Sequence, residues 1–179
     1  MKIGHVITGL NIGGAEKMLL GITNNLIDRG HNVTIIYLAS SADKLTLEFE
    51  KCGATLVCFD LESRFMRFSN LLRFLHFVRQ KQFDVLHCHL VHALFLGLFV
   101  KCVFNTKVIG SVHSVDEGGG ALRFFLQRFL WVFSRVIFIS DFVQQSFSAN
   151  GGIENGIVLN NFVEFEKIKP FGTSNSRPR

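Results

Sequence analysis

Short apolar runs alternate along the chain with segments in which apolar residues recur every three or four positions. The β-branched runs predict strands at 2–8, 33–38, 55–59, 84–88, 107–112, 135–139 and 156–160. The amphipathic segments predict helices at 14–29, 43–52, 69–82, 90–103, 121–134 and 141–149. Because strands and helices alternate, the pattern predicts an α/β fold, with a doubly wound, mainly parallel sheet of about seven strands and helices on both faces.

The ends of several helices carry residues that favour those positions. Gly30 follows the first helix, as glycine commonly does at a helix C-terminus. Ser69 is expected to cap the third helix, and Asp141 to lie in the first turn of the last helix, where a carboxylate complements the dipole. Residues 1–164 are expected to form one domain, and the polar segment 165–179 a linker or a frayed end.

Length and composition narrow the class of protein. The chain has 179 residues, of which 48% are hydrophobic, enough for one domain with a sizeable core. No apolar stretch reaches the ~18 residues of a membrane span, and the N-terminus does not read as a signal peptide, so a cytoplasmic location is expected. The four cysteines form no C-x-x-C pair and are expected to be free thiols.

A glycine-rich turn, with Gly9, Gly13 and Gly14, separates the first strand from the first helix. Its spacing matches neither a dinucleotide-binding motif nor a P-loop. Residues 36–40, at the end of the second predicted strand, contain no acid to bind ribose, which disfavours a nicotinamide-dependent oxidoreductase. Two interpretations remain. The glycines permit a tight turn, or they admit a phosphate group to the N–H groups at a helix start.

Histidines gather around the fourth predicted strand. His87, Cys88, His89 and His92 suggest a metal, but the set has no carboxylate neighbour and crosses a strand-to-helix boundary. We therefore predict no metal site, and we expect His89 to line a cleft. His5, in the first strand, is expected to be a core residue.

Several segments, in this order and spacing, carry a family resemblance. They are GLNIGGAEKMLLGITNNLIDRGHNVTII (9–36), DVLHCHL (84–90), KVIGSVHS (107–114), RVIFISDFVQQSF (135–147) and IVLNNFVE (157–164). Together they resemble the N-terminal, acceptor-side domain of GT-B glycosyltransferases, specifically the family 4-like group.

The resemblance implies a retaining hexosyltransferase that moves a sugar from a nucleotide-sugar donor to a glycan or lipid-linked acceptor. Such enzymes have two doubly wound domains, and the C-terminal one holds most of the donor. The sequence carries no second strand–helix series, so the donor-binding domain is expected to be supplied in cis or in trans, and the isolated chain to be inactive. A noncatalytic or split-subunit acceptor-binding module is the alternative. The nucleotide-sugar is a co-substrate, and no cofactor is expected.

The matched motifs assign the site. Gly13 and Gly14 match the loop that meets the donor diphosphate, and His113, at a strand end, matches the family's catalytic histidine. Asn161 belongs to the stretch near the interdomain hinge, where Glu164 replaces the usual aspartate. The residues expected to bind the acceptor or line the cleft are Glu16, His89, Ser114 and Asn161.

Basic and aromatic residues interleave in two places. The net charge is +5, and the window 64–82 carries five basic residues and no acid, so the rest of the chain is neutral. In the helix at 121–134, two aromatic residues fall opposite the apolar stripe. A membrane or partner surface is expected at Arg64, Phe65, Arg67, Phe124, Arg128 and Trp131. This predicts peripheral contact with an anionic membrane, ordinary packing being the alternative, and no nucleic-acid module is recognised.

Overall fold

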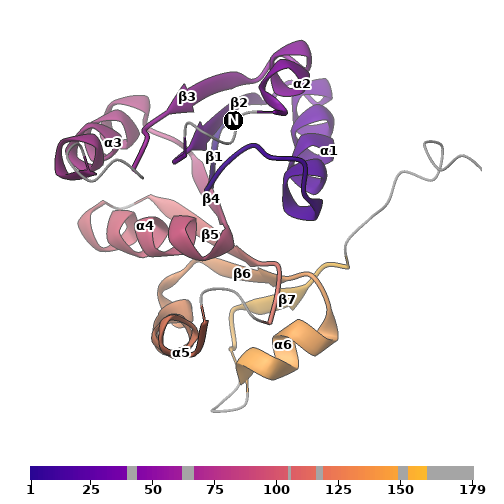
Figure 1. Ribbon diagram of the computed structural model, residues 1–179, viewed down its shortest axis with the longest axis vertical. Helices are drawn as coiled ribbons and strands as arrows, with labels where there is room; N and C mark the ends of the chain where they lie inside the picture. The colour runs from indigo at the N-terminus through magenta and orange to yellow at the C-terminus, as the bar shows by residue number, and fades with distance from the viewer. Residues whose placement is uncertain (40–43, 62–66, 105, 116–118, 149–152, 161–179) are drawn as a thin grey trace, which may run out of the picture.

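Seven parallel strands form one sheet at the centre of the molecule (Figure 1). The computed structural model describes residues 1–39, 44–61, 67–104, 106–115, 119–148 and 153–160. The strands are β1 (Lys2–Ile7), β2 (Asn32–Tyr37), β3 (Thr55–Cys58), β4 (Val85–His89), β5 (Lys107–Val112), β6 (Arg135–Phe138) and β7 (Gly156–Val158). Their order is β3-β2-β1-β4-β5-β6-β7, which confirms the doubly wound fold.

Helices cover both faces of this sheet. They are α1 (Gly14–Asp28), α2 (Thr46–Lys51), α3 (Arg67–Lys81), α4 (Leu90–Val103), α5 (Gly119–Phe129) and α6 (Asp141–Ser148). In Figure 1, α1 and α2 lie on one side of the sheet, and α3, α4 and α5 on the other. At the far end, α6 contacts β6 and β7, and Gln127 of α5 donates to the Ser146 carbonyl of α6 at 3.3 Å.

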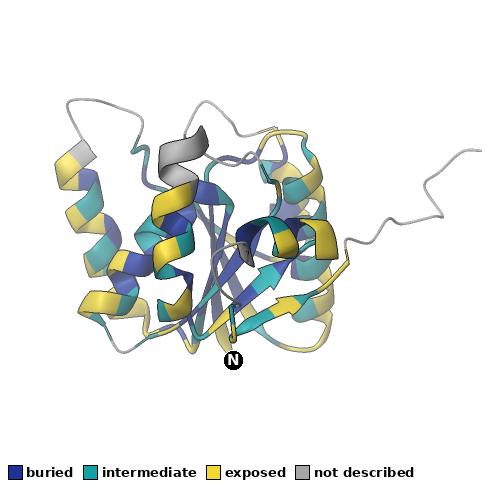
Figure 2. Cartoon of the chain, turned by 90° about the horizontal axis from the view of Figure 1, so that it is seen from below, coloured by how far each residue is buried: buried dark blue, intermediate teal, exposed yellow. Residues whose placement is uncertain are grey.

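The central strands are buried along most of their length because helices cover both of their faces. All of β1 after Lys2 is buried, and so are the last four residues of β4. Figure 2 shows the middle of the sheet mostly in the colour of buried residues. Alternate residues point to opposite faces. Val6 belongs to the core beneath α3, α4 and α5, and Ile7 to the core beneath α1 and α2.

Small residues bring α4 close to the sheet. A Cβ added at Gly97 would lie 2.7 Å from Cys88 Sγ, and one at Gly110 would lie 2.7 Å from Leu94 Cδ2. Such distances are shorter than van der Waals contact, so these glycines are required by close packing.

The observed ends of the helices test the predicted capping residues and helix lengths. Gly30 has φ 78° and donates to the Ile27 carbonyl at 2.8 Å, which confirms its C-terminal role. Asp141 is the first residue of α6, as predicted. The Ser69 cap is wrong, because α3 begins at Arg67. The helix predicted at 121–134 ends at Phe129 and continues as a 3-10 turn, η1 (Leu130–Val132).

Other expectations concern the whole chain. The four cysteines are free thiols, as predicted. Within the described ranges, no helix has both the length and the apolar character needed to cross a membrane. The predicted boundary at residue 164 and the tail at 165–179 lie outside the described residues and stay predictions.

Candidate functional site

The candidate site lies at the edge of the sheet where the strands end. Because all strands are parallel, their carboxyl ends share this edge. The strand order changes direction between β1 and β4, and such switch points form ligand-binding crevices in α/β folds. Gly13 follows β1 and His113 follows β5, with β4 between these two strands.

The glycine turn after β1 leads directly into α1. Gly13 is the N-cap of α1 with φ −139° and ψ 173°, an extended backbone that any residue adopts. A Cβ at Gly14 would meet no atom within 4 Å. Neither the backbone angle at Gly13 nor the space around Gly14 requires glycine. No side chain caps the start of α1, so the backbone N–H groups there can meet a ligand.

Glu16 lies in the first turn of α1 and is half-buried. Its carboxylate folds back over Gly13, so a Cβ added at that glycine would collide with Oε2 of Glu16. A carboxylate at this place complements the helix dipole. The negative charge of Glu16 would repel an incoming diphosphate, so we expect the Glu16 side chain to move away when such an anion binds.

Histidines of the adjacent strands β1 and β4, and His113 directly after β5, lie close together at one face of the sheet. His5 of β1 is in register with His87 of β4, and His89 of β4 with Ser111 of β5. His5 Nδ1 and His89 Nε2 are 3.0 Å apart, and His89 Nδ1 and His113 Nε2 are 3.4 Å apart. His5, His89 and His113 are called the histidine chain below. Beside it, His87 Nε2 and Ser111 Oγ share a hydrogen bond of 2.7 Å.

Burial keeps these rings neutral. It lowers the pKa of His5 and that of His113 each to about 4. Burial also holds the pKa of His87 and of His89 well below the usual value, and the neighbouring imidazoles add repulsion that lowers them further. At neutral pH, His113 therefore offers one N–H donor and one nitrogen acceptor rather than a positive charge.

The structure changes the role expected of His89. Its side chain is fully buried, so it does not line a cleft directly, and it lies against His113 instead. His5 is a core residue, as predicted. Ser114 follows His113 and is exposed. Asn161 lies outside the described residues.

Sequence reasoning missed the grouping of His5 with His87 and His89. Each offers one nitrogen, and the three nitrogens lie within 4.8 Å of one another. The signal was a His-x-His pair on one strand and a histidine on its neighbour, but it needs the strand register to be recognised. His92 is exposed on α4 and is not a member of this group.

An apolar pocket opens beside the same edge, and sequence reasoning missed it as well. Its volume is about 460 Å³. The lining comes from the ends of strands and from α3 and α4, namely Thr8, Leu38, Leu61, Leu71, His92, Phe95 and Leu96. Thr8 and His92 are the polar members of this lining, and the Thr8 hydroxyl is buried without a hydrogen-bond partner.

The predicted membrane or partner surface is described only in part. Phe124 is 66% exposed and Trp131 is 73% exposed, and the Trp131 indole N–H donates to the carbonyl of exposed Arg128 at 3.0 Å. Phe124, Arg128 and Trp131 are called the aromatic face below. Arg64 and Phe65 lie outside the described residues, and of Arg67, which opens α3, only the backbone is described.

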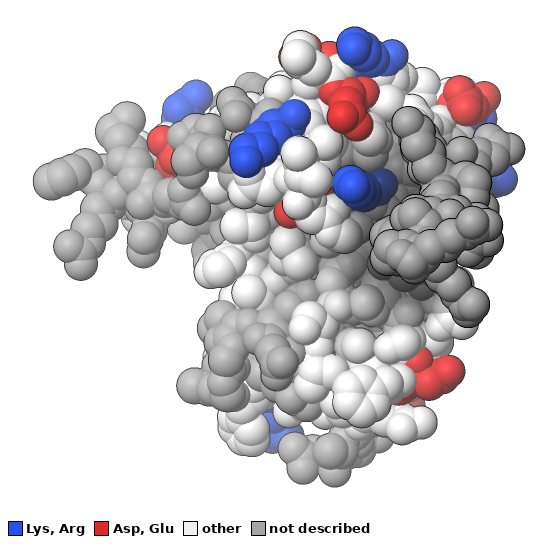
Figure 3. All heavy atoms as spheres, turned by 45° about the vertical axis from the view of Figure 1, so that its right-hand side comes forward, with Lys and Arg blue, Asp and Glu red and all other residues white. Residues whose placement is uncertain are grey.

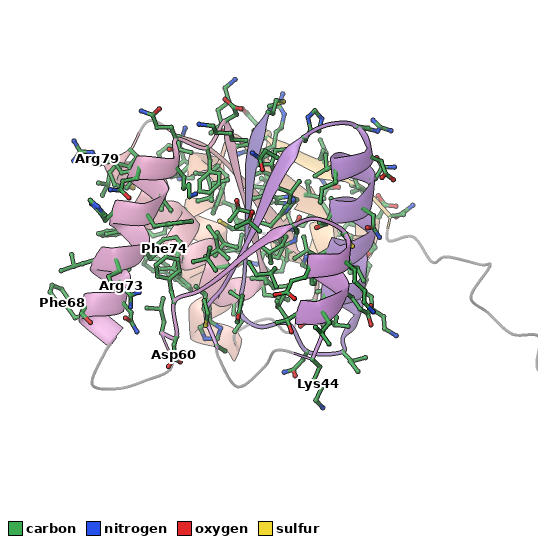
Figure 4. The ribbon with its side chains drawn as sticks, turned by 90° about the horizontal axis from the view of Figure 1, so that it is seen from above. Lys44, Asp60, Phe68, Arg73, Phe74 and Arg79 are labelled. Carbon is green, nitrogen blue, oxygen red and sulfur yellow. The ribbon has the colours of Figure 1, made fainter. Side chains whose placement is uncertain are left out.

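Exposed aromatic residues and charged residues are unevenly distributed over the described part of the molecule. Phe68 points away from α3, whereas Phe74 of the same helix points into the core (Figure 4). On the side shown in Figure 3, charged side chains concentrate over the N-terminal half of the sheet, and few lie over the end formed by β6, β7 and α6.

Solved structures share this architecture. A structure of Alr3699/HepE from Anabaena in complex with UDP and glucose has a TM-score of 0.75 and 17% identity, covering 93% of this chain and 46% of that one. A glycosyltransferase from Rickettsia africae has a TM-score of 0.74 and 18% identity, covering 94% and 46%. The lipopolysaccharide outer core galactosyltransferase WaaB has a TM-score of 0.68 and 13% identity, covering 94% and 48%. No curated protein matches the chain in sequence.

The fold is thus that of one half of a GT-B glycosyltransferase, and the chain spans about half the length of these solved structures. The sequence profile of Glycosyltransferase Family 4 matches residues 12–167. The chain belongs to this family.

Proposed function

We propose that the chain supplies the acceptor-side half of a retaining glycosyltransferase, which moves a hexosyl group from a nucleotide-sugar to a glycan or lipid-linked acceptor. The observation that carries the proposal is the placing of Gly14 and His113 at one edge of the sheet, on either side of the switch in strand order. The complex of HepE with UDP and glucose supports a nucleotide-sugar donor. The donor-binding domain is the partner that the chain requires.

Gly13, Gly14 and His113 each have a role in the proposed transfer. Negative charge develops on the departing diphosphate, and fixed donors that point at this charge lower the barrier. The backbone N–H groups at Gly13 and Gly14 supply such donors at the positive end of the α1 dipole. The neutral ring of His113 supplies a further hydrogen bond, either to the leaving group or to a sugar hydroxyl.

Titration with UDP tests the ligand. We expect the backbone amide NMR signals of Gly13, Gly14 and Ala15 to shift with UDP and to stay in place with uridine, which lacks the diphosphate. Gly14→Val should abolish the shifts because a branched side chain covers the amides. Gly14→Ala, which adds a methyl group to open space, is the matched control and should fold normally with only a partial loss. Shifts that map elsewhere would contradict the proposal.

The acceptor is proposed to be lipid-linked, on two observations. The pocket of about 460 Å³ is mostly apolar, which suits a hydrocarbon or aromatic portion. The aromatic face places a phenylalanine and a tryptophan in solvent beside an arginine, a combination typical of peripheral contact with anionic lipid. We propose that this surface rests on an anionic membrane.

Vesicle sedimentation tests the membrane contact. Wild-type chain should pellet with vesicles that contain anionic lipid, and Phe124→Ser with Trp131→Ser should lose most of this binding because the variant buries less apolar area. Leu47→Ser is the matched control, since Leu47 is 66% exposed on α2, on the other face. Equal pelleting of the two variants would refute the assignment of this face.

A further inference from the structure

We propose that His5 and His89 are positioning residues that set the tautomer of His113, so that its Nε2 accepts a hydrogen bond and its Nδ1 carries the proton. The hydrogen bond from that proton to a substrate rests on the proposed function. The tautomer itself is a property of the ligand-free chain and can be measured without any substrate.

The geometry of the histidine chain couples the three rings. His5 is 1% exposed and His89 is 0% exposed, and they come from adjacent strands whose register places both side chains on one face. A neutral imidazole has one N–H and one bare nitrogen. Because His89 contacts a neighbour through each of its nitrogens, it donates to one neighbour and accepts from the other. The proton position on one ring therefore decides the positions on the next.

The Nε2 atom of His5 decides in which direction the rings of the histidine chain donate their hydrogen bonds. His5 Nε2 is buried without a hydrogen-bond partner. If that nitrogen carried the proton, a buried N–H would be left unpaired, and unpaired buried donors are rarer than unpaired acceptors. The proton therefore lies on Nδ1 and is donated to His89 Nε2. His89 then carries its own proton on Nδ1 and donates it to His113 Nε2.

The consequence at the sheet edge is chemical. The second nitrogen of His113 is a donor, so a substrate group that it meets in a complex must be a hydrogen-bond acceptor, such as the oxygen of a sugar hydroxyl or of a diphosphate. Burial lowers the pKa of His113 to about 4, which keeps the ring neutral, so Nδ1 carries its proton over the whole neutral range. His5 and His89 act through His113 and need not touch the substrate.

The alternative is that the nitrogens of these rings bind a metal ion. The three nitrogens of His5, His87 and His89 lie within 4.8 Å of one another. However, His87 Nε2 is bonded to Ser111, and both His89 nitrogens are engaged. An ion would have to break these hydrogen bonds, so the geometry points to the proton chain.

The test is ring nitrogen NMR on the full chain with 15N-labelled histidine. Long-range proton–nitrogen correlations distinguish the two tautomers, and at neutral pH we expect His5, His89 and His113 all to show the Nδ1–H pattern. His89→Leu removes the hydrogen bond to His113 Nε2 and should move the resonance of that nitrogen to the position of an unbonded imidazole nitrogen. His89→Asn places an amide N–H near the lost Nδ1–H and should restore the original resonance. The exposed His76 and His92 should give unchanged signals, which reports on the fold.

The wild-type spectrum alone can overturn the proposal, even if a variant fails to fold. An Nε2–H pattern at His113 would contradict it, and so would a His113 Nε2 resonance that is the same in His89→Leu as in wild type. Binding of one equivalent of zinc by His5, His87 and His89 would also contradict the proposal, because these rings would then form a metal site. None of these results depends on whether UDP binds at Gly13 and Gly14.

Discussion

Lowering the pH from about 7 to about 5 is expected to reduce the free energy of unfolding steeply. The reason is that the fold holds four histidines in their neutral form, namely His5, His87, His89 and His113. Each histidine that is neutral when folded and charged when unfolded changes stability by about 1.4 kcal/mol per pH unit. A chain with four such groups should lose several kcal/mol within this range.

The sign follows from proton binding. An unfolded histidine titrates near pH 6.5, whereas His5 and His113 titrate at about 4 in the folded chain. Between these values, the unfolded state binds more protons than the folded state, so acid favours unfolding. Above pH 6.5 both states are neutral at these sites, and stability should not depend on them. The loss begins as the pH falls below about 6.5 and continues until the folded rings are protonated.

Urea unfolding at a series of pH values measures this effect. His5→Leu removes one of the four groups and should make the slope shallower in the window below pH 6.5. His76→Ala, a change at an exposed histidine of α3, is the matched control and should leave the slope as in wild type. Constant stability between about pH 7 and about pH 5 would show that the rings are not held neutral.

His113→Ala is expected to lower sugar transfer by roughly 100-fold to 1,000-fold, the range found when one stabilising donor is removed from a reaction site. The assay needs the chain combined with a donor-binding domain, in one polypeptide or as two. Because the lost hydrogen bond strengthens as charge develops, kcat should fall more than KM rises. His76→Ala again serves as the control, and a His113→Ala variant within about twofold of wild type would remove His113 from the reaction.

Much of the fold was predictable because its signals are local. Runs such as Val33 to Leu38 are apolar and β-branched, since central parallel strands are buried on both faces. Local signals set helix ends less well. Ser69 looked like a cap, yet α3 begins two residues earlier, and the 3-10 turn after Phe129 interrupts a pattern that reads as one helix.

Part of the candidate site could likewise be predicted from the sequence, and part could not. Gly13, Gly14 and His113 could be proposed from the order of segments along the chain. The link from His5 through His89 to His113 could not, because it depends on the register of three strands distant in sequence. Taken singly, His5 was expected to be only a core residue and His89 a residue of the cleft. The apolar pocket was missed for the same reason, since α3, α4 and strand ends each supply part of its lining.

The most direct test of the central claim is the formation of a glycoside by wild-type chain combined with a donor-binding domain. A panel of nucleotide-sugars would be offered with glycan and lipid-linked acceptors, and the anomeric configuration of the product read from proton NMR couplings. We predict transfer with retained configuration, dependent on both parts and lost in Gly14→Val. Undiminished transfer by the donor-binding domain without this chain, or a product of inverted configuration, would contradict the account.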